Sequence, residues 1–153
     1  MLEVGSAAPD FTLRDQHGQD VTLSTLRGTK SVVLMFFPFA FSGVCTGELC
    51  EVREKQPSFD TDDSHLMAIS CDPIFSLRAL ADRDALFFPL LSDFWPHGEV
   101  ARSYGAFDEE RGCATRSSFI VDKQGIVRWS VHNPMPEGRD LAEQLRVLAQ
   151  IGA

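Results

Sequence analysis

The stretch FFPFAFSGVCTGELC, residues 36–50, marks the point where the chain changes from strand to helix. Residues 31–37, which include the apolar run VVLM, are typical of a buried central strand. Pro38 ends this strand, because proline has no N–H to donate to the ladder and its ring fixes φ. From about Gly43 apolar residues recur at helical spacing, so we expect a helix with Cys45 in its first turn.

This position favours chemistry on the Cys45 sulfur. The first turn of a helix leaves backbone N–H groups unpaired, and the helix dipole adds positive potential there. A thiol in such a place has its pKa lowered from near 8.5 to roughly 3.5–7.5, which makes it a thiolate at neutral pH. Ser42, three residues earlier, is placed to cap the helix or to offer its hydroxyl to the sulfur. The alternative is a structural core cysteine, which is the more frequent role of an isolated cysteine.

The motif Pro38-x-x-x-Ser42-x-x-Cys45 resembles the active-site motif of the peroxiredoxins, Pro-x-x-x-Thr/Ser-x-x-Cys. The resemblance covers nearly the whole chain and includes the segments GSAAPDFTL, PLLSD, VARSYG and RSSFIVD (residues 5–13, 89–93, 100–105 and 116–122). Within the family, FPFAF and SDFWPHG (residues 37–41 and 92–98) are most similar to the actinobacterial alkyl hydroperoxide reductase E group. The resemblance implies a thioredoxin-like fold and a thiol peroxidase acting on hydrogen peroxide and organic hydroperoxides.

The same resemblance implies a role for each residue of the site. Cys45 is the peroxidatic cysteine, whose thiolate attacks the peroxide and becomes a sulfenic acid. Arg116 polarises the O–O bond and stabilises the leaving alkoxide, and Glu48 orients that arginine. Pro38 shields the sulfur from water, and Ser42 forms hydrogen bonds to the thiolate and the peroxide. By sequence position alone, Arg116 would be a surface arginine at the start of a strand.

Cys50 departs from the alkyl hydroperoxide reductase E group, in which this helix position need not be a cysteine. The spacing Cys45-x-x-x-x-Cys50 resembles the Q-type, or bacterioferritin-comigratory, peroxiredoxins, whose resolving cysteine lies five residues further on. It implies an intramolecular disulfide that a thioredoxin, a glutaredoxin-like protein or a low-molecular-weight thiol then reduces. Cys50 without a redox role is the alternative. Cys113, in a loop near Arg116, is the backup candidate, and Cys71 is expected in the core.

Three other functions are alternatives to this two-cysteine cycle. One is a one-cysteine cycle in which an external thiol resolves Cys45 directly, and another is a non-catalytic peroxide or redox sensor. A thioredoxin-fold disulfide reductase should carry Cys-x-x-Cys, which the chain lacks. The same absence argues against a zinc site, and the four histidines are scattered, so no metal or other cofactor is expected.

Length and composition are consistent with one domain over residues 1–153 that buries its own core. Hydrophobic residues make up 44% of the chain and charged residues 24%, which are ordinary globular values. The net charge of −8 argues against nucleic acid and anionic membranes as partners. The N-terminus lacks the pattern of a signal peptide, and no apolar run approaches the roughly 20 residues of a membrane span. We therefore expect a cytoplasmic protein. Several members of the family that this chain resembles dimerise edge to edge, so both a monomer and a homodimer remain open.

Strand and helix patterns alternate after a leading hairpin, which predicts an α/β protein whose central mixed sheet is flanked by helices. Pro57 is expected to kink or end the helix that begins near Gly43. The other expected elements are a hairpin (11–14 and 21–23), one helical turn (24–28), strands at 65–70, 87–91, 117–121 and 126–131, a stiff loop (133–138), and helices at 75–84, 98–104 and 139–151.

Overall fold

The structure is a computed structural model that describes residues 1–134 and 139–152. Its strands are β1 (Thr12–Arg14), β2 (Asp20–Thr22), β3 (Ser31–Phe36), β4 (Ser64–Ser70), β5 (Leu90–Ser92), β6 (Phe107–Asp108), β7 (Cys113–Ala114), β8 (Arg116–Val121) and β9 (Val127–Asn133). Its helices are η1, a 3₁₀ helix (Leu23–Leu26), and the α-helices α1 (Gly43–Phe59), α2 (Ile74–Asp84), α3 (Glu99–Ser103) and α4 (Leu141–Gln150).

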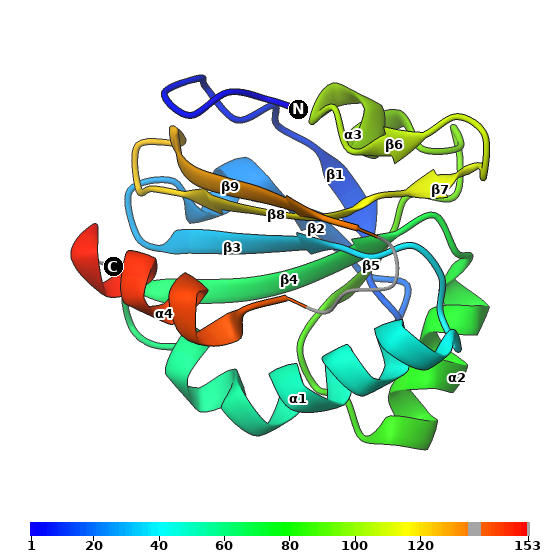
Figure 1. Ribbon diagram of the computed structural model, residues 1–153. Helices are drawn as coiled ribbons and strands as arrows, with labels where there is room; N and C mark the ends of the chain where they lie inside the picture. The colour runs from blue at the N-terminus through cyan, green and yellow to red at the C-terminus, as the bar shows by residue number, and fades with distance from the viewer. Residues whose placement is uncertain (135–138, 153) are drawn as a thin grey trace.

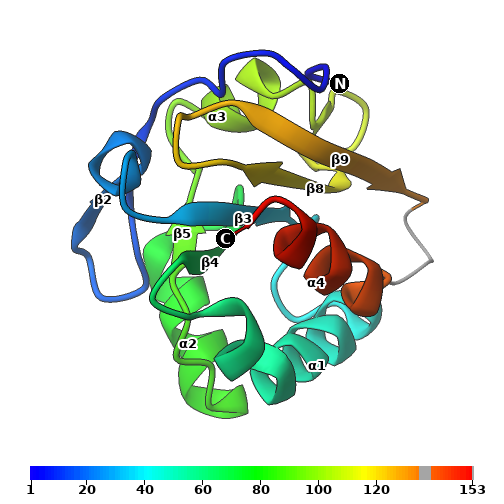
Figure 2. The ribbon, with the colours of Figure 1, turned by 90° about the vertical axis from the view of Figure 1, so that its left-hand side faces the viewer.

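Seven of the strands form one mixed sheet in the order β2-β1-β5-β4-β3-β8-β9, and β6 pairs separately with β7. Strand β3 runs parallel to β4 and antiparallel to β8, and β5 runs parallel to β4. Strands β1 and β2 form the predicted antiparallel hairpin. Helices α1, α2 and α4 cover one face of the sheet, and α3 lies over the other (Figures 1 and 2). The α/β class, the mixed sheet and the leading hairpin are therefore confirmed.

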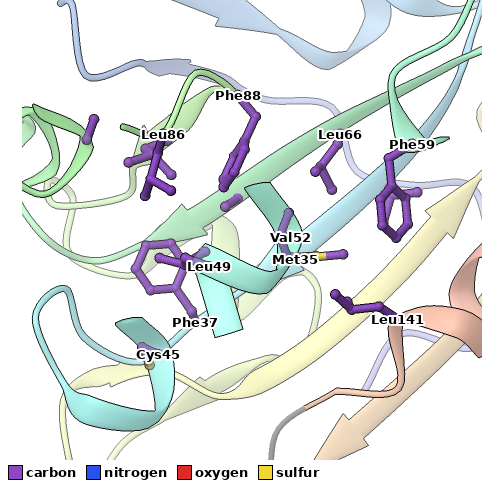
Figure 3. Close-up of a cluster of buried hydrophobic side chains, with 14 of the residues drawn as sticks. Met35, Phe37, Cys45, Leu49, Val52, Phe59, Leu66, Leu86, Phe88 and Leu141 are labelled. Atoms are coloured by element: carbon purple, nitrogen blue, oxygen red, sulfur yellow. The ribbon is translucent and has the colours of Figure 1, made fainter. Parts of the chain in front are cut away.

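All six residues of β3 are buried, because both faces of this central strand are covered. Val33, Met35 and Phe37 point to the layer of α1, α2 and α4, whereas their neighbours pack on the opposite side. Figure 3 shows Cys45, Leu49 and Val52 of α1 on the side of the helix that faces the sheet. The predicted helix face is thus confirmed, and it places Cys45 against the sheet.

Of the two predicted effects of Pro57, ending the helix is wrong, because α1 continues through Pro57 to Phe59. Pro57 lies in the last turn, where its missing N–H removes a single hydrogen bond of the helix. Two contacts beyond it hold the helix together. The Phe59 ring is fully buried, and the backbone N–H of Asp60 donates to the Gln56 carbonyl at 2.8 Å.

The remaining elements follow the predictions with shifted ends. Strand β5 begins at Leu90, since Pro89 lacks a ladder donor and Phe87 is exposed. Helix α4 begins at Leu141 because the Asp140 carboxylate caps it, accepting from the Glu143 N–H at 3.0 Å. The small β6–β7 ribbon was not predicted from the sequence. Of the stiff loop expected over residues 133–138, residues 135–138 lie outside the described residues.

The burial of the end of α1 can be tested by substitution. Phe59→Ala removes a fully buried ring and should lower the free energy of unfolding by about 3–5 kcal/mol. Phe75→Ala, a matched control at a ring that is 79% exposed, should change it by less than about 0.5 kcal/mol. Urea unfolding followed by circular dichroism measures both. Equal effects would contradict the packing described for the last turn of α1.

Candidate active site

Cys45 lies in the first turn of α1, directly after the loop that follows β3. Ser42 occupies the N-cap position with extended backbone angles, and its carbonyl accepts the first bond of the helix from the Thr46 N–H at 2.8 Å. Cys45 is only 1% exposed, so it is buried at the amino end of the helix. The unpaired N–H groups and the positive dipole at this end of a helix favour an anion there.

Arg116 reaches this sulfur from the first residue of β8. Strand β8 runs antiparallel to β3 with Ser117 opposite Phe36, so the beginning of β8 lies where β3 ends. The Arg116 Nη2 group donates to the Cys45 Sγ atom at 3.3 Å, and its Nη1 group donates to Glu48 Oε1 at 3.0 Å. The side chains of Arg116 and Glu48 are 2% and 4% exposed. Three residues predicted to act together are therefore in contact.

Arg139 is a functional candidate that the sequence reasoning missed. Its backbone N–H and its Nε group both donate to the Glu48 carboxylate at 2.8 Å. Its Nη1 group donates to the Ser117 carbonyl at 2.9 Å and to the Ser118 hydroxyl at 2.7 Å, and its Nη2 group donates to a carbonyl of β3. One signal was present in the sequence: a basic residue at the start of a helix opposes the helix dipole and so needs another reason to be there.

The charges of this buried cluster favour an anion on Cys45. Glu48 forms ion pairs with both Arg116 and Arg139, so two cations share one carboxylate. Burial lowers the pKa of the Arg139 guanidinium, while the charge of Glu48 and its hydrogen bonds act in the opposite direction. Buried charge is costly unless it is balanced, and the Cys45 sulfur lies within hydrogen-bond distance of Arg116 in this cluster of two cations and one carboxylate.

Ser42 and Pro38 lie on the segment that joins β3 to α1. The Ser42 hydroxyl donates to the Phe39 carbonyl at 3.2 Å and makes no side-chain cap bond, so the predicted capping by its hydroxyl is wrong. The hydroxyl closes the turn before the helix instead of reaching a first-turn N–H. Pro38 is buried at the end of β3, where the preceding Phe37 N–H still donates to the Ile69 carbonyl at 2.9 Å.

The other three cysteines differ in exposure. Cys50 is partly exposed and lies in the same intact helix as Cys45. Cys71 and Cys113 are buried, which confirms the core position expected for Cys71. Burial, and next the nearby Asp93 carboxylate, raises the pKa of Cys71 to about 12. Burial and Asp108 raise the pKa of Cys113 to about 11, so both are neutral thiols at physiological pH.

Within residues 1–134 and 139–152, no three His, Cys, Asp or Glu side chains are grouped to hold a metal ion. None of the helices in this part of the chain is long and apolar enough to cross a bilayer.

The Glu48 bridge predicts a large effect of its removal. Glu48→Gln leaves two arginines buried with a neutral partner and should lower the free energy of unfolding by about 3–5 kcal/mol. Glu51→Gln on the same helix breaks an exposed pair with Lys55 at 3.7 Å and should cost less than about 1 kcal/mol. Chemical unfolding of both variants is the measurement. A Glu48 variant as stable as the Glu51 variant would contradict the bridge.

Comparisons with known proteins show which family the chain belongs to. Residues 4–130 match the AhpC/TSA family. The chain is 51% identical over 140 residues to alkyl hydroperoxide reductase E of Mycobacterium tuberculosis, with 92% of each chain covered. It is 36% identical over 151 residues to peroxiredoxin 2 of Thermoplasma acidophilum, which covers 95% of this chain and 74% of that protein.

Solved structures agree with the sequence comparisons. Enterococcus faecalis AhpC has a TM-score of 0.89 and 29% identity to this chain, covering 99% of this chain and 93% of that one. Peroxidoxin BcpB of Mycobacterium tuberculosis has a TM-score of 0.86 and 29% identity, covering 99% of both chains. The expected thioredoxin-like fold is confirmed by these structural relatives.

Proposed function

Because the chain belongs to the AhpC/TSA family of peroxiredoxins, which are thiol peroxidases, we propose that Cys45 is its peroxidatic residue. The contact of 3.3 Å between the Arg116 guanidinium and the Cys45 sulfur carries this proposal. It combines with the position of Cys45 in the first turn of α1 and with the two-arginine cluster around Glu48. The substrates we propose are hydrogen peroxide and organic hydroperoxides.

In the first step the Cys45 thiolate attacks one oxygen of the peroxide. A sulfur–oxygen bond forms and the O–O bond breaks, so that Cys45 becomes a sulfenic acid. The other oxygen leaves as an alkoxide or hydroxide and takes up a proton to give an alcohol or water. A lowered thiol pKa supplies only about tenfold in rate, because nucleophilicity falls as the pKa falls. Donors fixed at the departing oxygen are worth about 10²–10³ each, and Arg116 and the first-turn N–H groups are placed to serve.

Within this scheme, Glu48 positions Arg116 and does not touch the peroxide. Pro38, buried at the end of β3, shields the sulfur from water. Ser42 would exchange the bond that its hydroxyl donates to the Phe39 carbonyl for one to the thiolate or the peroxide.

The assignment of Cys45 is tested by removing single sulfur atoms. Cys45→Ser should abolish peroxide consumption, because a serine hydroxyl is not ionised at neutral pH. Cys71→Ser, the control at a buried thiol of raised pKa, should retain the activity of the parent protein. Peroxide consumption with excess dithiothreitol measures both. Full turnover by the Cys45 variant would refute the assignment.

For the second step we propose that Cys50 condenses with the Cys45 sulfenic acid to a disulfide, releasing water. Residues five apart in an intact helix are about 7.5 Å apart along the axis and roughly 140° around it. Their Cα atoms are then about 8–9 Å apart, whereas a disulfide requires about 4.4–6.8 Å. Both cysteines lie within α1, so the first turns of this helix must unwind before the bond forms. A thioredoxin, a glutaredoxin-like protein or a low-molecular-weight thiol then reduces the disulfide.

Gly47, exposed between the two cysteines, makes this unwinding testable. Gly47→Ala stabilises a helix by about 1 kcal/mol, so it should slow disulfide formation about fivefold and increase sulfinic acid at high peroxide. Its first oxidation should proceed at the parent rate. Stopped-flow fluorescence and mass spectrometry of the oxidised protein separate the two steps.

Cys50→Ser distinguishes the two-cysteine cycle from its alternatives. The proposal requires that this variant form no intramolecular disulfide after one equivalent of peroxide. A disulfide to Cys113 or Cys71 at the parent rate would transfer the role to that residue. Full turnover with an external thiol and no disulfide in the parent protein would establish the one-cysteine cycle, and absence of turnover with every thiol would establish a sensor.

We further propose that residues 1–153 act as one cytoplasmic domain that forms a homodimer. Several aromatic side chains are exposed beside the site, at or after the carboxyl ends of the parallel strands β3, β4 and β5: Phe39, Phe41, Phe75, Phe94 and Trp95. A hollow of about 450 Å³ lies among Phe75, Phe94 and Trp95. Exposed apolar area of this kind is typical of an interaction surface. Sedimentation equilibrium of the parent protein and of Trp95→Ser should show a dimer weakened by the substitution.

A further inference from the structure

The loop before Cys45 contains a strained residue. Phe41 has a φ of 68°, in the left-handed region that bulky side chains rarely adopt. Its ring is 46% exposed, so burial of the ring in the core does not hold the backbone in this state. A residue in a sparsely populated conformation costs free energy and persists only when its surroundings impose it. The contacts that impose it are therefore of interest, because Phe41 lies four residues before Cys45.

Asp72, between β4 and α2, makes the first of these contacts. Its Oδ2 atom accepts a hydrogen bond from the Ala40 N–H at 2.9 Å, immediately before Phe41. The Ser70 hydroxyl donates to the same oxygen at 2.7 Å, and the Ser92 hydroxyl donates to the Asp72 carbonyl at 2.6 Å. The carboxylate is thus held by Ser70 at the end of β4, and the Asp72 backbone is held by Ser92 at the end of β5, so that Asp72 ties the loop to the sheet.

Arg83, near the end of α2, makes the second contact. Its guanidinium lies 4.8 Å from the centroid of the Phe41 ring, and its Nη2 group donates to the Thr46 hydroxyl at 3.4 Å. The Asp84 carboxylate accepts from the same guanidinium at 2.9 and 3.0 Å and fixes its orientation. Arg83 therefore touches the chain on both sides of Cys45, once in the loop and once in the first turn of α1.

We propose that Asp72 and Arg83 form a clamp on the active-site loop that sets how readily the first turn of α1 opens. This inference rests on the proposed role of Cys45 and on the unwinding step described above. The clamp keeps the loop in its strained, closed form, in which the Arg116 guanidinium donates to the Cys45 sulfur. When the clamp is released, the strain at Phe41 favours the open form in which Cys45 is accessible to a resolving thiol. Both residues are positioning residues, since neither contacts the sulfur.

The region in which opening becomes faster distinguishes the clamp from a contact that only stabilises the fold. Loss of a contact that only stabilises the fold should speed amide hydrogen exchange throughout the protein. Loss of the clamp should speed exchange only in the loop and in the first turns of α1. An exposed cation–π contact of this kind corresponds to a two- to fivefold change in an equilibrium constant. The closed form reacts with peroxide and the open form is resolved. Releasing the clamp should therefore speed resolution and lower the yield of sulfinic acid.

Amide hydrogen exchange of the reduced full-length protein tests the clamp without using peroxidase activity. Arg83→Ala and Asp72→Ala should each speed exchange in residues 43–50 about two- to fivefold, and exchange in α4 should stay at the parent rate. Arg83→Lys, which keeps the cation but loses the planar fork, should give an intermediate value. Arg78→Ala, at an exposed arginine of the same helix, is the control and should leave residues 43–50 unchanged.

A second readout uses oxidised protein. At fixed excess peroxide, the sulfinic fraction of Cys45 measured by mass spectrometry should fall at least twofold in Arg83→Ala relative to Arg78→Ala. Exchange in residues 43–50 that matches the parent in both clamp variants would overturn the proposal, as would a rise of equal size in α4. Turnover by Cys45→Ser would refute the proposed function instead, and it would leave the exchange result standing.

Discussion

The site depends on one buried carboxylate, that of Glu48, which binds Arg116 and Arg139 at the same time. Through these bonds the first turns of α1, the start of β8 and the residue two positions before α4 are fixed to one another. Glu48 lies three residues after Cys45, so both side chains are on one face of the helix. Fixing the carboxylate therefore fixes where the sulfur meets the Arg116 guanidinium. Without the carboxylate, two guanidinium groups would be buried together, and their repulsion would move Arg116 away from its position at the sulfur.

The sheet explains why these segments meet. Strands β3, β4 and β5 are parallel, so their carboxyl ends share an edge, and β8 begins at that same edge because it is antiparallel to β3. The helix that follows β3 therefore starts beside Arg116. Gly43 and Val44 at the start of α1 are exposed, whereas Val52 and Phe59 further along the helix are fully buried. Opening of the first turns, which the second proposed step requires, would leave Val52 and Phe59 packed in the core but would have to expose the buried Cys45.

Much of this architecture could be predicted from the sequence, because its determinants are local. The apolar run of β3, the proline after it and the spacing of Cys45, Leu49 and Val52 identified the strand, the turn and the helix face. The position of Arg116 was inferred from a family motif, since only the register of β8 against β3 brings it to Cys45. Arg139 was missed because its partners lie 91 and 22 residues away. Helix α1 continues past Pro57 because the distant core holds Phe59, which no local rule records.

In the proposed mechanism, Arg116 stabilises the transition state of O–O cleavage as well as the thiolate. Two quantities test this directly: the second-order rate constant with hydrogen peroxide and the thiolate fraction of Cys45. Both are measured in Arg116→Lys and in the parent protein. Lysine keeps the charge but loses the planar fork that reaches both Cys45 and Glu48. We expect the rate constant of the variant, corrected for the thiolate fraction at each pH, to fall by about 10²-fold. A corrected rate constant equal to that of the parent would contradict it, and Arg116 would then act on the thiolate alone.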